Sequence, residues 1–117
     1  MNVVLLANDL MVVSRLQSAT TQLGAQLLSA ANAIEAVELC ENESAGLLVV
    51  DLATAGLELG FVQQLKTGAA QNIRIVAFGP HVHKERLAAA RDAGCDLVLS
   101  RGQFFNDVEA IVKSAAN

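Results

Sequence analysis

Short apolar runs alternate along the chain with segments whose apolar residues recur every three or four positions. The runs are continuous and rich in Val, Leu and Ile, which is typical of strands buried on both faces of a parallel sheet. They predict five strands, at residues 2–7, 25–30, 46–51, 72–78 and 96–100. The segments that follow them predict five helices, at residues 10–23, 33–42, 57–65, 83–94 and 104–116.

Regular alternation of strand and helix predicts parallel strands joined by right-handed crossovers. The predicted fold class is therefore α/β, a (βα)5 doubly wound parallel sheet with strand order 2-1-3-4-5. The 117 residues fit one domain, over 1–117. The helical spacing predicts inward faces made of Val12, Leu16, Ala19 and Leu23, then Ile34, Val37 and Cys40, and finally Phe104, Val108, Ile111 and Ala115.

Several polar or unusual residues follow the predicted strands directly. Asn8 and Asp9 follow the first strand, and Asp51 ends the third. Gly79 follows the fourth strand and Arg101 the fifth. Because ligands of doubly wound sheets collect at the carboxyl ends of the strands, we expect these side chains to form one site. Asp9 is also a candidate N-cap for the first helix.

Composition and charge restrict the classes of partner. The net charge of −4 argues against direct nucleic-acid binding, which relies on a Lys/Arg surface. No apolar run reaches membrane-spanning length, and the start "MNVVLLAND" lacks the basic region of a signal peptide. Cys40 and Cys95 are far apart and form no CxxC motif, so we expect buried, inert thiols in a cytoplasmic protein.

The whole chain resembles the receiver domain of bacterial response regulators. "MNVVLLAND" resembles the opening strand and acidic pair of the family, and "NAIEAVELC" its second helix. "LLVVDLATAG" is similar to the segment around the phospho-accepting Asp, and "AAARDAGCDLVLSR" to the fourth helix and fifth strand. The resemblance implies a CheY-like fold, a place in two-component signal transduction, and Mg²⁺ as cofactor. It also implies a protein partner: a histidine kinase, an output domain or a second copy as a homodimer.

The family's functional positions carry over to particular residues. Asp51 stands at the phospho-acceptor position, and Arg101 at the position of the family's Lys. Asn8 and Asp9 stand where the family has two acidic residues that hold Mg²⁺, and Gly79 where it has the Thr or Ser of the conformational switch. The resemblance thus implies a metal site at Asp9 and Asp51.

The sequence departs from the family at most of these positions. The acidic pair aligns either with Ala7 and Asn8 or with Asn8 and Asp9, so at least one carboxylate is missing. Residues 77–79 include no hydroxyl, and Gly102 replaces the Pro that follows the family's Lys. We therefore expect the Mg²⁺ site to be weak or absent.

Asp51 has two interpretations. It is either a nucleophile that forms an acyl phosphate, or a structural carboxylate at the sheet edge whose pKa is lowered by pairing with Arg101. The departures from the family favour the second. Asp9 is likewise a metal ligand or an N-cap, and we expect the cap.

Phe104 and Phe105 form the candidate partner surface. They are adjacent, so both cannot face the core fully, and an exposed ring would mark a contact patch. The alternative is that the second ring lies flat over the end of the sheet. His81 and His83 form a spaced pair, which we expect to be a solvated turn rather than a metal site.

Three functions remain open from the sequence. The first is an atypical receiver that binds protein partners largely without phosphorylation and is not an enzyme. The second is a working phospho-acceptor that takes phosphate from a histidine kinase on Asp51 with weak Mg²⁺ binding. The third is a flavodoxin-like domain for a nucleotide or anion, which would need a phosphate-binding turn that "ANDLMVV" does not offer.

Overall fold

The computed structural model describes residues 1–116 of the chain. Five strands form one parallel sheet in the order β2-β1-β3-β4-β5. This confirms the predicted fold class and strand order. The strands are β1 (Asn2–Leu6), β2 (Gln26–Ala30), β3 (Leu47–Asp51), β4 (Arg74–Gly79) and β5 (Leu97–Ser100).

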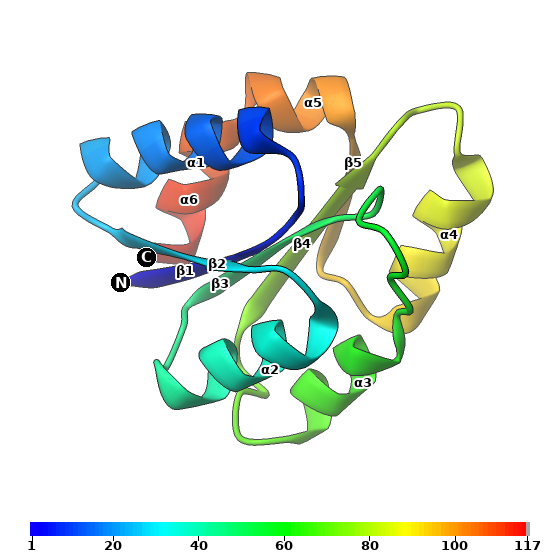
Figure 1. The fold of residues 1–117 in the computed structure, drawn as a ribbon, viewed down its shortest axis with the longest axis horizontal. Coiled ribbons are helices and arrows are strands. Elements are labelled where there is room, and N and C mark those ends of the chain that lie inside the picture. Colours follow the sequence, from blue (N-terminus) through cyan, green and yellow to red (C-terminus); the bar gives the residue numbers. More distant parts are fainter. Residues whose placement is uncertain (117) are drawn as a thin grey trace.

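Helices cover both faces of this sheet. Helices α1, α5 and α6 lie on one face, and α2, α3 and α4 pack against the other (Figure 1). The helices are α1 (Leu10–Gln22), α2 (Ala33–Asn42), α3 (Gly60–Thr67), α4 (Lys84–Ala93), α5 (Arg101–Asn106) and α6 (Val108–Ala116). None of the helices in residues 1–116 has both the length and the apolar character needed to cross a bilayer.

The sheet separates two apolar cores, and its central strand serves both. Successive β3 side chains point to opposite faces. Leu47 and Val49 join the core beneath α1 and α6, whereas Leu48 and Val50 join the core beneath α2, α3 and α4. All five residues of β3 are buried, which explains why its sequence is apolar up to Asp51.

The last predicted helix is two helices, and it begins earlier than expected. Ser100 caps α5: its hydroxyl accepts a hydrogen bond from the backbone N–H of Gln103, while the Gln103 side chain accepts from the N–H of Ser100. This reciprocal capping starts the helix at Arg101. Asp107 then separates α5 from α6.

Two predicted inward positions and one predicted helix start are wrong. Ile34 is 75% exposed, because α2 turns Ala36, Val37 and Cys40 toward the sheet instead. Leu23 is 42% exposed at the C-cap of α1. The third helix begins at Gly60, so Leu57 is buried from the preceding loop rather than from a helix.

The two cysteines are free, as expected, although Cys95 is only partly buried. Burial raises the pKa of Cys40 to about 12 and that of Cys95 to about 11. Since the thiolate is the reactive form, neither residue is a ready nucleophile.

Candidate functional site

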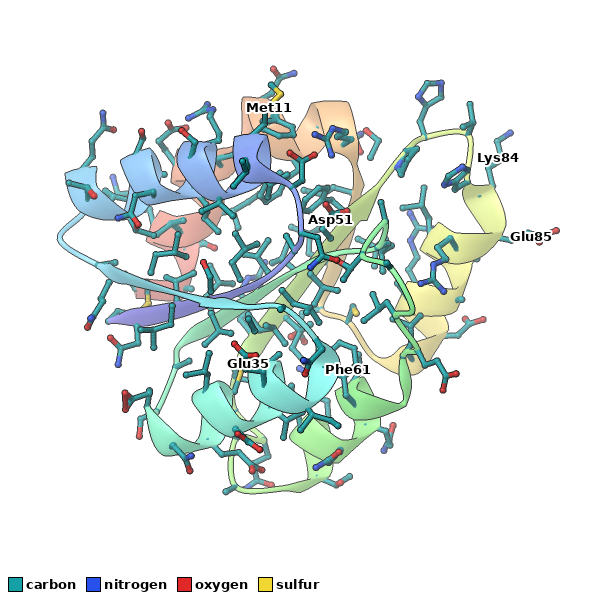
Figure 2. The ribbon with its side chains drawn as sticks, viewed as in Figure 1. Met11, Glu35, Asp51, Phe61, Lys84 and Glu85 are labelled. Atoms are coloured by element: carbon teal, nitrogen blue, oxygen red, sulfur yellow. The ribbon has the colours of Figure 1, made fainter. Side chains whose placement is uncertain are left out.

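Asp51 lies at the carboxyl edge of the sheet, as predicted. It ends β3 beside Phe78 of β4 and is only 3% exposed. Figure 2 shows it where the chain leaves the sheet. Its Oδ1 accepts a hydrogen bond from the backbone N–H of Ala53 at 2.9 Å, so the carboxylate also shapes the turn that follows.

Thr54 closes this turn and was missed by the sequence analysis. Its hydroxyl donates to the backbone carbonyl of Asp51 at 2.6 Å, and its backbone N–H donates to the same oxygen at 3.0 Å. Thr54 is 5% exposed and thereby fixes the backbone of Asp51. The Asp-x-x-Thr spacing is a turn signal that would have found it.

The predicted effect on the pKa of Asp51 is wrong in sign. Burial raises its pKa, because a low-dielectric environment disfavours the charged form. The hydrogen bond from Ala53 and the charge of Arg101 oppose this effect, and the charge of Asp9 adds to it. Arg101 does not form the expected ion pair with Asp51, because it pairs with Asp9 instead.

Asp9 is the N-cap of α1, which confirms that prediction. Its Oδ1 accepts from the backbone N–H of Met11 at 2.8 Å, and its Oδ2 accepts from Nη2 of Arg101 at 2.9 Å. The hydrogen bond from Arg101, above all, holds the pKa of Asp9 below its usual range. Both oxygens of this carboxylate are therefore engaged.

The Asn8 side chain bonds to the backbone of the loop before α2. Its side-chain nitrogen donates to the backbone carbonyl of Ala31 at 3.3 Å, which ties the end of β1 to the loop before α2. The Asn8 amide thus has a structural role in this geometry.

The carboxylates at this edge are poorly set up for a resident Mg²⁺, because the Asp9 carboxylate already binds Arg101. This ion prefers near-octahedral oxygen coordination through carboxylates and water. Within residues 1–116, no group of three or more His, Cys, Asp or Glu side chains could hold a metal ion. A guanidinium supplies positive charge at this edge, and it occupies the Asp9 carboxylate. His81 and His83 are both exposed.

The space beside Gly79 is filled by Leu52. A Cβ at Gly79 would lie 3.3 Å from Cβ of Leu52 and 3.7 Å from Cδ2 of Leu87. Leu52 is 3% exposed and follows Asp51 directly. The position predicted as the switch therefore lacks a hydroxyl and also has little room for a side chain.

Arg86 ties α4 to the loop after Asp51. Its Nη2 donates to the carbonyl of Leu57 at 2.9 Å and its Nε to that of Leu52 at 3.3 Å. No local sequence motif predicts this contact, since the donor and its acceptors are about thirty residues apart.

Phe104 does not belong to a partner surface, which corrects half of that prediction. It is fully buried and stacks on Phe78, with ring centroids 4.1 Å apart and planes 9° apart. Phe105 is half-buried and meets Phe104 edge to face at 5.6 Å. The guanidinium carbon of Arg101 lies 5.0 Å from the centre of the Phe105 ring.

An apolar groove of about 430 Å³ adjoins this ring. Its apolar lining comes from Phe105 and from the first two residues of α1, Leu10 and Met11, which are 83% and 71% exposed. Met11 points outward from the start of α1 in Figure 2.

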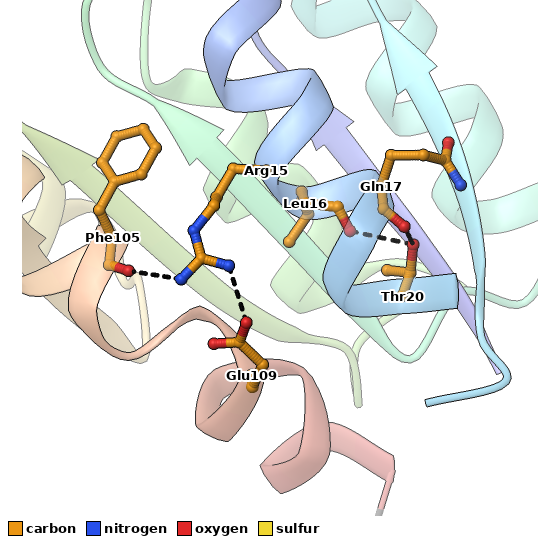
Figure 3. Close-up of polar contacts among 6 residues, drawn as sticks. All are labelled: Arg15, Leu16, Gln17, Thr20, Phe105 and Glu109. Atoms are coloured by element: carbon orange, nitrogen blue, oxygen red, sulfur yellow. Dashed lines mark hydrogen bonds and ion pairs between the residues drawn. The ribbon is translucent and has the colours of Figure 1, made fainter. Parts of the chain in front are cut away.

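Arg15 fixes the relative position of the helices that flank the groove. Its Nη1 donates to Oε1 of Glu109 at 2.7 Å and its Nη2 to the carbonyl of Phe105 at 3.1 Å (Figure 3). Nearby, the buried hydroxyl of Thr20 donates to the carbonyls of Leu16 and Gln17 within α1 (Figure 3).

No protein-family model matches the sequence, and a search of curated proteins finds no match. Solved structures, however, match it over almost its whole length. The signal receiver domain of a DNA-binding response regulator from Colwellia psychrerythraea has a TM-score of 0.82 at 18% identity, covering 99% of this chain and 98% of that one. A CheY-like receiver domain protein from Methanospirillum hungatei has a TM-score of 0.80 at 16% identity, covering 98% and 93%.

A third similar structure is the receiver domain of a sensor histidine kinase from Pseudomonas aeruginosa, with a magnesium ion coordinated in its active-site cleft. Its TM-score is 0.82 at 13% identity, covering 99% of this chain and 98% of that one. At such identities the likeness establishes the fold. The chain therefore has the receiver-domain fold of the response regulators, as its sequence resemblance implied.

Proposed function

We propose that this chain is an atypical receiver-fold module of two-component signalling, which binds protein partners without requiring phosphorylation of Asp51. The observation that carries the proposal is the Arg101–Asp9 ion pair at 2.9 Å. It commits the Asp9 carboxylate to a guanidinium and to the cap of α1.

Phosphoryl transfer to a carboxylate depends on positioning and on neutralising the charge of the transferred group. Asp51 is 3% exposed, so a phosphodonor has little access to it in this geometry. The nearby positive charge is already paired with Asp9, which weakens its action on Asp51. These contacts favour a structural role for Asp51 over a nucleophilic one.

The packing around Gly79 also supports the proposal. A conformational switch needs two alternative arrangements of the same elements. Here Leu52 fills the space beside Gly79, and Arg86 holds α4 to the same loop. Both contacts favour one arrangement of the site edge and α4.

Leu10, Met11 and Phe105 form the partner surface in this proposal. Two adjacent exposed apolar side chains beside an aromatic ring are a typical protein-contact patch. The partner we propose is a protein of the same signalling class, such as a histidine kinase or an output domain, in the cytoplasm. The free thiols fit such a reducing compartment.

The alternative is a working phospho-acceptor, and one observation favours it. The charge of Arg101 acts on Asp51 and lowers its pKa in part. If the guanidinium released Asp9, it would be near enough to neutralise an anion on Asp51. The alternative therefore requires the ion pair to open.

Incubation with acetyl phosphate and Mg²⁺, followed by intact-mass spectrometry, separates the two functions. The proposal predicts no acid-stable, base-labile adduct of one phosphoryl group. Asp51→Asn is the matched control, because it removes only the acceptor oxygen. An adduct on the unaltered chain that disappears in this variant would overturn the proposal.

Partner binding gives the complementary test once a partner protein is purified. Asp51→Ala will leave the affinity within about twofold, whereas Met11→Ser will weaken it by roughly tenfold or more, as expected for a contact residue. Dependence of binding on Asp51 under phosphorylating conditions would support the phospho-acceptor instead.

A further inference from the structure

A second apolar groove lies between α2 and α3, with a volume of about 280 Å³. Val37 and Phe61 form its floor and are nearly buried, at 6% and 7% exposure. Ile34 forms part of its rim and is 75% exposed. Pockets for drug-sized ligands usually measure roughly 300–1,000 Å³, so this groove suits one or two apolar side chains rather than a small molecule.

Ile34 places an exposed apolar side chain at the rim of this groove. The α2 helix presents Ala36, Val37 and Cys40 to the core, which leaves Ile34 on the outer side of the helix. Covering this large β-branched side chain with a partner would remove apolar surface from water and lower the free energy of the complex.

The charge around the groove identifies the chemistry of the partner. Helices α2 and α3 together carry three acidic residues and a single cation, Lys66. Two of the acidic residues, Glu38 and Glu41, line the groove itself. Within residues 1–116, neither of them forms an ion pair, and the next cation along the chain, Lys66, is bound to Asp96 at 2.6 Å.

The negative charge at the groove restricts which class of molecule can bind there. It repels nucleic acid and anionic lipid surfaces. The described residues include no group of three or more His, Cys, Asp or Glu side chains that could hold a metal ion. A second copy of this chain carries a net negative charge of its own, which disfavours self-docking here.

We infer that the α2/α3 groove docks a basic amphipathic segment of a partner protein, whose apolar side chain enters between Ile34 and Phe61 while flanking Lys or Arg residues pair with Glu38 and Glu41. Such a segment matches the apolar floor and the uncompensated carboxylates together. Helix-in-groove binding of this kind is a recurring mode of peptide recognition.

This surface is distinct from the groove of Leu10, Met11 and Phe105. Helices α2 and α3 lie on the opposite face of the sheet from α1 (Figure 1). Figure 2 shows Glu35 on α2 and Phe61 on α3, away from Met11. The inference therefore does not depend on whether Asp51 accepts phosphate.

The test uses the full chain labelled with ¹⁵N and a designed peptide probe. The probe is a helical peptide of roughly 14 residues, with leucines on one face and lysines on the other, which is near the minimum length for an isolated helix. Amide shifts on titration are expected in residues 33–41 and 60–65. A scrambled peptide of the same composition is expected to bind at least about tenfold more weakly, since it cannot present one apolar face.

Variants separate the groove from general charge attraction. Ile34→Ser, and the double variant Glu38→Lys with Glu41→Lys, are expected to weaken binding by roughly tenfold or more. The matched control is Glu85→Lys with Asp92→Lys, which makes the same change in net charge at exposed positions of α4. Its affinity is expected to stay within about twofold.

Circular dichroism and thermal unfolding check the fold of each variant. Ile34→Ser is expected to keep the fold because Ile34 is exposed. Equal binding of the scrambled peptide, or an equal loss in the α4 control, would overturn the inference in favour of non-specific electrostatics. Shifts centred on Met11 and Phe105 would also overturn it. None of these readouts involves Mg²⁺ or phosphate, so their failure is distinguishable from failure of the proposed function.

Discussion

The packing of Leu52 over Gly79 predicts that a hydroxyl cannot simply be restored at the switch position. A Cβ at Gly79 would lie 3.3 Å from Cβ of Leu52 and 3.5 Å from its Cδ1. Gly79→Thr adds further atoms in the same space, and overpacking of this kind costs about 1–3 kcal/mol. The better strand propensity of Thr returns about 1 kcal/mol, so we expect a net loss of about 0–2 kcal/mol.

Shortening the neighbouring side chain should relieve part of this cost, because Leu52→Ala removes Cδ1 but keeps the Cβ that would lie 3.3 Å from a Cβ at Gly79. Leu52→Ala alone is expected to lower the free energy of unfolding by about 2–5 kcal/mol, because Leu52 is nearly fully buried. In the double variant the Thr side chain occupies the vacated space. The combined loss should therefore be about 1–2 kcal/mol smaller than the sum of the two single losses.

Urea unfolding followed by circular dichroism measures all four free energies of this cycle. A parallel cycle of Leu52→Ala with Gly60→Ala is the control, because a Cβ at Gly60 meets nothing within 4 Å. The control cycle should be additive within about 0.5 kcal/mol. If the cycle of Gly79 and Leu52 were equally additive, Leu52 would not be the residue that fills the switch position.

Two further predictions concern the aromatic pair and the buried carboxylate. Phe104→Ala should lower the free energy of unfolding by about 3–5 kcal/mol, whereas Phe105→Ala should lower it by about half as much because the Phe105 ring is half-buried. Urea unfolding measures both losses. Equal losses would contradict the assignment of Phe104 to the core. Burial raises the pKa of Asp51, so stability is lost as the pH rises from the ordinary Asp pKa of 3.8 toward the folded-state pKa, and the whole loss is present above it. Asp51→Asn should therefore raise the free energy of unfolding at pH 7, and this gain should vanish below the ordinary Asp pKa of 3.8. Unfolding curves across this pH range measure the gain, and a loss of stability at pH 7 would refute the sign.

The architecture was predictable because its determinants are local. Continuous apolar runs specify strands that are covered on both faces, and the helices between them require parallel crossovers. The cap at Asp9 was likewise predictable, since an N-cap depends on the residue type directly before a helix. The capping box of Ser100 and Gln103 is equally local, and its S-x-x-Q signature correctly indicates a helix that starts at Arg101.

The site was less predictable because its contacts are set by tertiary packing. Sequence position alone could not decide whether Arg101 would pair with Asp51 or with Asp9, since both carboxylates reach the same edge of the sheet. The helical rotation that exposes Ile34 depends on how α2 sits on the sheet. The contacts of Leu52 and Arg86 join segments about thirty residues apart, beyond the reach of any local pattern.

The most direct test of the central claim is an amide NMR titration of the unaltered chain, first with Mg²⁺ and then with beryllofluoride, which mimics an acyl phosphate. The account predicts no saturating shift at Asp9, Asp51, Gly79 or Arg101, because the Asp9 carboxylate is already committed and Asp51 is buried. Saturating shifts at these residues that disappear in Asp51→Asn would contradict the account and would establish a working phosphorylation site.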